Sequence, residues 1–377
     1  AHGRFALQVW RDCGAVQYPP REACHRCTSV RLQWRDQDGA GELLSETLLH
    51  HSNDLFFRER LPWRLGMARL DAGPTVVVHL HADVPPAPSR LRVRAMLDKA
   101  GQAVLVGVPE SETPNMTDDR QLREMTCDPK FRKVLVTDGK TAVGQAIVRA
   151  LAAAEADPIW VGYAEPWKKF PGFDELRAMP QVTLMPLDVT DSRSVRELAG
   201  EIGGKVDILI NNAEYHRTFG ISGRAGVETA RTEMDINYFG LLRLAQEFGP
   251  AMRSRGADGL SSAVAWVNLL SIYALTNFPP HGTFSASKAA AHSLSQCLRA
   301  EMRPSGVRVI NVYPGPIDDE WNQLIPPPKV APAALANAIV KALRDGVEDV
   351  YPGDVAQEWL ERWRDNPKAL EREISAG

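Results

Sequence analysis

The sequence predicts a two-domain protein in which a small all-β domain precedes an α/β domain with a doubly wound parallel sheet. Beyond residue 131, short apolar runs alternate with helical segments, as in a parallel sheet that is covered by helices on both faces. Before residue 110, short apolar runs are separated by Gly, Pro and Asp at close spacing, which favours small antiparallel structure. A chain of 377 residues is long enough to form two hydrophobic cores.

The expected boundaries follow from a change in composition. The segment 109–132 is polar, contains three prolines and lacks sustained apolar periodicity, which is typical of a connector. We therefore expect a small domain over 1–110, a linker over 111–130, and the α/β domain with a C-terminal helical tail over 131–377. The small domain is expected to have strands at 41–49, 65–70, 75–80 and 103–108.

In the large domain we expect six strands and a long helix over 285–303, which carries three consecutive alanines and so favours close helix packing. The apolar runs assigned to strands are short, and helical segments of the length a crossover needs separate them. The expected strands cover 134–136, 159–161, 182–185, 208–210, 263–270 and 307–312.

Composition excludes several classes of partner. The net charge is −3 and 24% of the residues are charged, so no basic surface for nucleic acid or an acidic membrane is expected. The sequence contains no apolar stretch of about 18 residues and no N-terminal signal pattern. Five cysteines in a chain of this size do not make a disulfide framework. These features predict a soluble cytoplasmic protein.

Residues 133–151 have the strand, turn and helix layout of a nucleotide-binding unit, where backbone N–H groups meet a pyrophosphate at a helix N-terminus. Further polar and glycine positions follow the later strands in a characteristic order. Together these positions resemble the short-chain dehydrogenase/reductases, so the large domain is expected to be of the Rossmann type. The cofactor-binding positions implied by the resemblance are Thr137, Gly139, Gly144, Asp188, Asn211, Asn212, Ala213, Lys288, Pro314 and Gly315.

The resemblance implies hydride transfer between a nicotinamide and a carbonyl or alcohol, with a tyrosine as acid/base. Ser271 and Lys288 occupy the family's catalytic serine and lysine positions, and Asn237 matches the asparagine that supports a water near the lysine. Phe284 stands where the tyrosine belongs. Because phenylalanine has no proton to give, this position cannot supply the usual acid/base step.

The cofactor turn also departs from the family pattern. Asp138 and Ala142 replace two of its three glycines, and Glu214 replaces the glycine of the Asn-Asn-Ala-Gly motif. The added Cβ would crowd the backbone, and the two carboxylates would stand near a pyrophosphate and a ribose. These replacements argue against NAD(P) binding.

Two alternatives within this domain stay open. Glu165 at the end of the second strand favours NAD over NADP, whereas the nearby Lys168 and Lys169 leave NADP open. Tyr273 lies two residues after Ser271, and His281 lies three residues before Phe284. Either could serve as an alternative proton donor. Otherwise Tyr273 is a wall of the pocket and His281 is a histidine of a surface loop.

In the small domain, Cys24 and Cys27 form a CxxC turn and Cys13 precedes it, a pattern typical of zinc ligands. With β-rich sequence following, this region resembles small proteins that join a rubredoxin-like zinc ribbon to an OB fold (the DUF35 type). A fourth ligand could come from His2 or His25; alternatively, the ribbon has lost its metal. The resemblance implies docking to acyl-CoA or to a partner enzyme such as a thiolase.

Two main functions follow. The first is an accessory or scaffold subunit of acyl-CoA (β-oxidation-like) metabolism, a pseudoenzyme that pairs with a thiolase or an active dehydrogenase of the same family. The second is an active NAD(P)-dependent oxidoreductase on a hydroxyacyl- or oxoacyl-CoA with an unusual proton donor. The family's helix-mediated dimer interface implies a homo- or hetero-oligomer. A nucleic-acid-binding OB module is a third function, and the acidic net charge argues against it.

Overall fold

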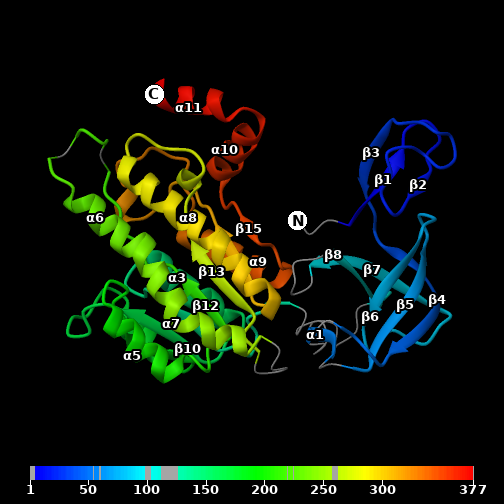
Figure 1. Cartoon of the computed structure of the whole chain (residues 1–377), viewed down its shortest axis with the longest axis horizontal. Helices are drawn as coiled ribbons and strands as arrows, with labels where there is room; N and C mark the ends of the chain where they lie inside the picture. The colour runs from blue at the N-terminus through cyan, green and yellow to red at the C-terminus, as the bar shows by residue number, and fades with distance from the viewer. Residues whose placement is uncertain are drawn as a thin grey trace. The chain divides into compact units, whose positions relative to one another are not determined.

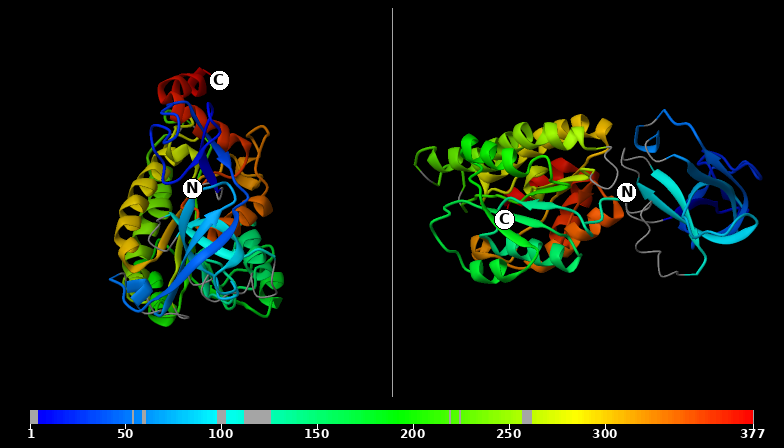
Figure 2. Two further views of the ribbon diagram at one scale, coloured as in Figure 1. Left: turned by 90° about the vertical axis from the view of Figure 1, so that its right-hand side faces the viewer. Right: turned by 90° about the horizontal axis from the view of Figure 1, so that it is seen from below.

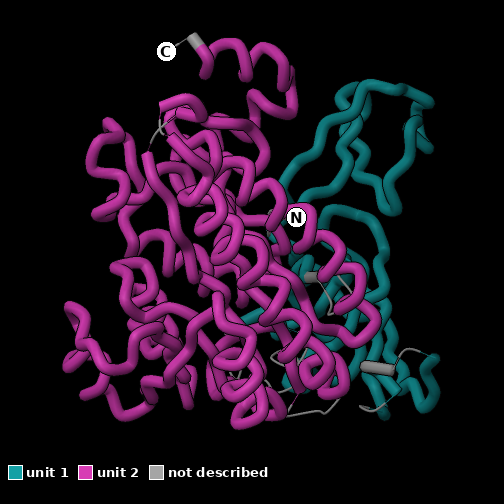
Figure 3. The backbone as a smooth tube through the Cα atoms, turned by 60° about the vertical axis from the view of Figure 1, so that its left-hand side comes forward, with its two compact units in different colours: residues 1–126 teal, residues 127–377 magenta. Residues whose placement is uncertain are grey.

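The structure, a computed structural model, describes residues 5–53, 55–58, 61–97, 103–111, 126–218, 220–223, 225–256 and 262–376. The chain divides into two compact units, Ala1–Thr126 and Cys127–Gly377, which are coloured separately in Figure 3. Most of the expected linker, residues 112–125, lies outside the described residues. The two units are therefore described one at a time.

Unit 2 is built around a parallel sheet with the strand order β11-β10-β9-β12-β13-β14-β15 (Figure 1). The predicted α/β fold is confirmed, and each of the six expected strands is present. The central strands are buried along their whole length because helices cover both faces. The strands are β9 (Val134–Val136), β10 (Ile159–Tyr163), β11 (Val182–Pro186), β12 (Ile208–Asn211), β13 (Ala265–Leu269), β14 (Arg308–Val312) and β15 (Asp349–Val350).

Helices lie on both sides of this sheet (Figure 2). One apolar core joins the sheet to α3, α4 and α9, and a second core joins its other face to α5, α7 and α8. The bounds are α3 (Ala142–Ala153), α4 (Phe173–Ala178), α5 (Ser192–Ile202), α7 (Leu241–Ser254), α8 (Gly282–Met302) and α9 (Pro332–Asp345).

The other helical segments lie in the connections between strands or close the chain. Helix α8 begins at Gly282, three residues before the expected start, because the helix can begin directly after Pro279 and Pro280. Among the helices that the structure describes, none combines the length and apolarity needed to cross a membrane. The remaining segments are α6 (Glu228–Met234), a π-helical turn (Asp235–Gly240), 3-10 turns (Ile272–Ala274, Arg303–Ser305, Glu320–Asn322), α10 (Asp354–Asp365) and α11 (Pro367–Ala376).

Unit 1 contains a three-stranded antiparallel sheet and a closed five-stranded barrel, as expected for an OB-like domain. The barrel includes β7, which sequence reasoning missed: its arginines alternate with buried Leu91 and Val93. The elements are β1 (Ala6–Trp10), β2 (Val16–Gln17) and β3 (Leu32–Asp36) of the sheet, β4 (Ala40–Leu49), β5 (Trp63–Leu70), β6 (Thr75–Leu80), β7 (Ser89–Leu97) and β8 (Ala103–Pro109) of the barrel, and the short helix α1 (Leu55–Arg58).

Candidate active site

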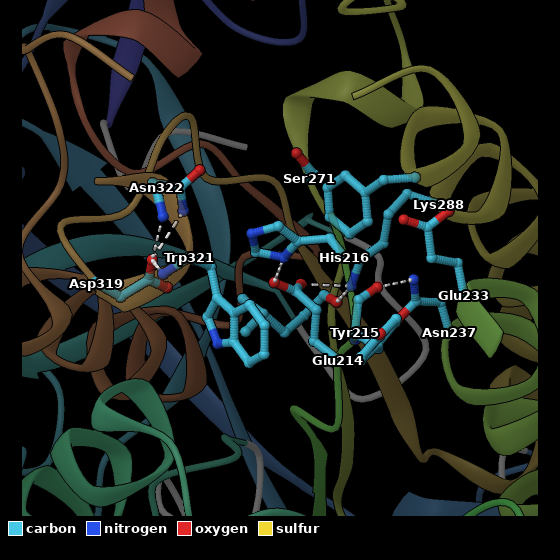
Figure 4. Close-up of polar contacts among 12 residues, drawn as sticks. Glu214, Tyr215, His216, Glu233, Asn237, Ser271, Lys288, Asp319, Trp321 and Asn322 are labelled. Carbon is cyan, nitrogen blue, oxygen red and sulfur yellow. Dashed lines mark hydrogen bonds and ion pairs between the residues drawn. The ribbon is translucent and has the colours of Figure 1, made fainter. Parts of the chain in front are cut away.

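The candidate site lies where the central parallel strands end. The loops that follow β9, β12, β13 and β14 meet at this edge of the sheet because the strands run in one direction. They bring together polar residues that are far apart in the sequence, including Glu214, Asn237, Ser271 and Lys288 (Figure 4). The site is thus assembled by the topology that the sequence predicts.

The predicted cofactor residues of the first and fourth strands bind each other. The Thr137 hydroxyl accepts hydrogen bonds from the backbone N–H groups of Asn212 (3.0 Å) and Ala213 (3.1 Å) and lies 3.3 Å from the Asn211 Oδ1. The Asn212 amide accepts from the Asp138 N–H at 3.0 Å and donates to the Asp138 carbonyl at 2.7 Å. These residues clamp the turn after β9 to the loop after β12.

Two glycines of the turn are required by packing. A Cβ on Gly144 would lie 1.9 Å from the Asp138 carbonyl oxygen, and one on Gly139 would lie 2.3 Å from Val161 Cγ1. The Asp138 carboxylate accepts from the Lys140 N–H at 2.8 Å. Burial raises the pKa of Asp138, although Lys140 opposes this effect. The turn is therefore compact, but it places an acidic side chain where the family has glycine.

A cavity of about 260 Å³ lies beside this turn and the N-terminus of α3. Its lining includes the carboxylates of Glu214, Asp319 and Glu320 and the cation Lys140. The Lys140 ammonium lies 3.3 Å from the Glu165 carboxylate, so its charge is partly neutralised. Because Glu214 is paired with Lys288, Asp319 and Glu320 are the acidic residues of this lining that would repel a pyrophosphate. The residues of this cavity do not fit a nicotinamide dinucleotide.

Glu214 forms a buried ion pair with Lys288. The Glu214 carboxylate lies 2.7 Å from the Lys288 ammonium, and the two side chains are 15% and 2% exposed. The ammonium also donates to the Leu269 carbonyl at 2.8 Å. Burial opposes ionisation of Glu214, but Lys288 and His216 outweigh it and lower the pKa of Glu214 to about 2. The lysine that holds the ribose in the family is therefore bound by a carboxylate of its own chain.

His216 is a member of the site that sequence reasoning missed. Its Nδ1 lies 3.2 Å from Glu214 Oε1, and its ring centroid lies 4.8 Å from that of Phe284. The Nε2 atom is buried and has no hydrogen-bond partner among the described residues. The only sequence signal for this histidine is its place two residues after the unusual Glu214.

Ser271 and Phe284 line a second, much smaller cavity of about 20 Å³, together with Glu214 and His216. This volume holds about one water molecule. The Ser271 hydroxyl accepts from the Tyr273 N–H at 3.2 Å and lies 3.5 Å from the Pro314 carbonyl. The cavity therefore leaves little room beside the Ser271 hydroxyl.

Asn237 lies in the π-helical turn Asp235–Gly240, a distortion that is common at functional sites. Its amide donates to the Tyr215 carbonyl and to the Ser287 hydroxyl, both at 2.9 Å. Its carbonyl accepts from the Tyr215 N–H at 3.1 Å. Asn237 therefore holds the loop that carries Glu214 and His216.

Tyr273 and His281, the alternative proton donors, are buried in an aromatic cluster with Phe278. Burial raises the pKa of Tyr273. Burial, aided by nearby His216, lowers the pKa of His281 to about 4. His281 has no hydrogen-bond partner on either ring nitrogen within the described chain. Both side chains are therefore held neutral near pH 7.

The outer predicted cofactor residues have local structural roles. The Asp188 carboxylate accepts from the backbone N–H of Thr190 at 2.9 Å and from its hydroxyl at 2.7 Å, which forms the turn before α5. The Pro314 carbonyl accepts from the Ile272 N–H at 2.9 Å, and Gly315 lines the small cavity. These contacts position the loops around the site.

The three predicted thiol ligands of unit 1 converge. The sulfur atoms of Cys13, Cys24 and Cys27 all lie within 4.8 Å of one another, and Cys13 and Cys24 are 3.5 Å apart. This arrangement fits three corners of a tetrahedral zinc site. The ring of His25 lies 2.9 Å from the Gln17 Oε1, and His2 lies outside the described residues.

Comparison with known proteins agrees with this architecture. The family model "short chain dehydrogenase" matches residues 132–328, and the model "ChsH2, C-terminal OB-fold domain" matches residues 34–104. A short chain dehydrogenase of Burkholderia cenocepacia, solved in complex with NADP, is 33% identical, with a TM-score of 0.59 over 66% of this chain and 98% of that chain. A Streptomyces avermitilis short-chain dehydrogenase is 26% identical, with a TM-score of 0.55 over 65% and 97% of the two chains.

Curated relatives match the same region. Short-chain dehydrogenase PC-15 of Penicillium crustosum is 32% identical over 40% of this chain, and an uncharacterized oxidoreductase of Mycobacterium bovis is 31% identical over 53%. The match spans 56% and 59% of the lengths of these two relatives. Residues 34–104 of the chain form an OB-fold domain of the ChsH2 type, which precedes the large domain in the sequence. Because the short chain dehydrogenase model covers more than half of the chain, and the sheet has the expected strand order, the chain belongs to the short-chain dehydrogenase family.

Proposed function

We propose that this protein has lost nicotinamide-dependent hydride transfer and acts as an accessory subunit. The observation that carries the proposal is the 2.7 Å ion pair between Glu214 and Lys288. The family's lysine must be free to hold the cofactor ribose and to lower the pKa of the catalytic tyrosine. Here its charge is neutralised by Glu214, and Phe284 occupies the tyrosine position. Lys288 is therefore not free to hold a ribose, and it has no tyrosine whose pKa it could lower.

The partner we propose is a thiolase or an active dehydrogenase of the same family, working on acyl-CoA substrates. Support comes from the fused ChsH2-type OB domain and from the helical surface of unit 2, where Phe239 is exposed at the π-helical turn. Zinc held by Cys13, Cys24 and Cys27 would brace the sheet of unit 1 next to the barrel, a structural role in folding rather than in catalysis.

A calorimetric titration with NADH and with NADPH tests the loss of hydride transfer. We expect no heat of binding up to millimolar cofactor. Micromolar binding of either cofactor would contradict the proposal. Affinity purification from the native cell tests the accessory role separately: a thiolase or an active dehydrogenase should copurify in a fixed ratio, and recovery of the chain alone would contradict that part.

The second candidate is an active oxidoreductase on a hydroxyacyl- or oxoacyl-CoA. It is favoured by the Burkholderia relative, whose structure contains NADP, and by the presence of a cavity beside the N-terminus of α3. Glu165 would favour NAD, although its pairing with Lys140 weakens that preference. The same titration separates the candidates, and oxidation of a hydroxyacyl-CoA with production of NADH would establish this one.

A further inference from the structure

The small cavity is bordered by a chain of polar contacts from Lys288 through Glu214 to His216. Lys288 binds one oxygen of the Glu214 carboxylate at 2.7 Å, and His216 Nδ1 lies 3.2 Å from the other oxygen. An ionised carboxylate only accepts hydrogen bonds, so His216 Nδ1 must carry the proton of this contact. In the neutral ring, Nε2 is then an unprotonated acceptor.

No structural contact among the described residues uses this acceptor atom. His216 Nε2 is buried and unpartnered within the described chain, although a buried polar atom without a partner is costly. His216 and Ser271 line the same small cavity, and Figure 4 shows the imidazole between Glu214 and the Ser271 region. The ring lies against Phe284, whose position holds the proton donor in the family. The imidazole of His216 and the hydroxyl of Ser271 therefore border one small cavity.

We propose that His216 is a general base that enolises a small uncharged carbonyl compound, without any nicotinamide. Nε2 takes a proton from the carbon next to the carbonyl, the C–H bond breaks, and its electron pair forms the enolate double bond. The negative charge passes to the carbonyl oxygen, which the Ser271 hydroxyl stabilises by donating a hydrogen bond. Return of a proton from the imidazolium restores the carbonyl compound, so the step needs no oxidant or reductant.

The surroundings select this class of ligand. Apolar side chains, including Leu270, Phe284 and Ile317, form much of the lining, together with the polar side chains of Tyr273 and Asn322. None of these other lining residues carries a cation that would bind an anion. Glu214 is a positioning residue that fixes the ring and stabilises the imidazolium, as the carboxylate of a catalytic triad does. A small neutral ketone combines an apolar body with one oxygen for Ser271.

The 3-10 turn Glu320–Asn322 lies beside the cavity. The ring of Trp321 lies 5.6 Å from that of His216, and Asn322 lines the cavity. The Arg217 guanidinium lies 4.5 Å from the rings of both Tyr215 and Trp321, which fastens the turn to the loop of His216. A ligand larger than water must displace this turn.

The test is deuterium incorporation into acetone, cyclopentanone and hydroxyacetone in D₂O, followed by proton NMR with the full chain and no nicotinamide. We expect the wild type to accelerate exchange of at least one of the three ketones above an equal concentration of free imidazole. His216→Gln should lose about 100-fold to 10,000-fold of this acceleration. His292→Gln is the matched control, because His292 lies on α8 with its ring 2.8 Å from the Tyr313 hydroxyl and does not line the cavity. No acceleration of any of the ketones, equal exchange by His216→Gln, or loss in His281→Gln alone would overturn the proposal.

Two further readouts keep the test valid if a variant folds poorly. In ¹⁵N-histidine NMR of the wild type, His216 should show the Nδ1–H tautomer, and Glu214→Gln should change this signal together with the exchange rate. Chloroacetone should alkylate His216 Nε2 in the wild type, forming a C–N bond and releasing chloride. Alkylation confined to exposed histidines such as His50 and His51 would count against the proposal.

Discussion

Replacing Glu214 by glutamine removes a buried charge and keeps the shape of the side chain. The wild-type carboxylate is 15% exposed and lies 2.7 Å from an ammonium that is 2% exposed. Burial opposes ionisation, but Lys288 and His216 lower the pKa of Glu214 from its ordinary 4.5 to about 2. A tenfold change in proton affinity is worth about 1.4 kcal/mol, so this difference corresponds to about 3 kcal/mol of folding stability.

The pH dependence gives this prediction a signature. The pKa of Glu214 is lower in the folded state, so its contribution to stability is complete above pH 4.5 and disappears as the pH falls towards 2. Glutamine does not titrate. The wild type should therefore exceed Glu214→Gln by about 3 kcal/mol near neutral pH. The difference should shrink only below about pH 4.5.

The assay is urea unfolding followed by helical circular dichroism. This signal reports unit 2, because α1 is the only described helix of unit 1. Glu228→Gln is a matched control: Glu228 pairs with Arg231 on the surface, where the side chains are 81% and 73% exposed, and should show no measurable loss. Equal stability of Glu214→Gln and wild type, or a difference that does not depend on pH, would refute the reasoning.

The remaining predictions concern the cofactor turn, the metal and the buried histidine. Glu214→Gly restores the family's glycine and frees Lys288, so calorimetry should detect NADPH binding with a dissociation constant of about 0.1 mM or below, where the wild type shows none. Continued absence of binding would mean that Glu214 is not the residue that excludes the cofactor. Gly144→Ala places a Cβ 1.9 Å from the Asp138 carbonyl oxygen and should cost about 3 kcal/mol in urea unfolding, whereas Gly200→Ala in α5 meets no atom within 4 Å and should be neutral or stabilising. The purified protein should contain about one zinc ion per chain by atomic emission, and Cys24→Ser should lose it; a metal-free wild type would show that the ribbon is a packed turn. Because the folded-state pKa of His281 falls from 6.5 to about 4, acid should destabilise unit 2 as the pH falls from 6.5 to 4, by up to about 3 kcal/mol, and urea unfolding of His281→Phe should lack this dependence.

Parts of the site could be predicted because they depend on position along the chain. Thr137, Ser271 and Pro314 follow successive strands, and a parallel sheet brings such positions to one edge. Phe284 was identifiable because its spacing from Ser271 matches the family. Glu214 was visible as an acidic replacement of a glycine, but its partner was not.

Other parts could not be predicted because they depend on side-chain orientation. Glu214 and Lys288 are 74 residues apart in the sequence. Their side chains meet only when α8 packs beside the loop that follows β12. His216 lies in an irregular loop, where no periodicity indicates which side chain points inward. The strand β15 was not predicted, because a strand of two residues is too short to show an apolar pattern.

By itself, the sequence determined the α/β fold, the small β domain and the family, because apolar periodicity and motif spacing are properties of the linear chain. Only the tertiary structure decided that Lys288 is ion-paired with Glu214 and that the Nε2 atom of His216 is buried without a hydrogen-bond partner among the described residues. These outcomes depend on distances of about 3 Å between groups from different loops, and such distances exist only after the helices pack on the sheet.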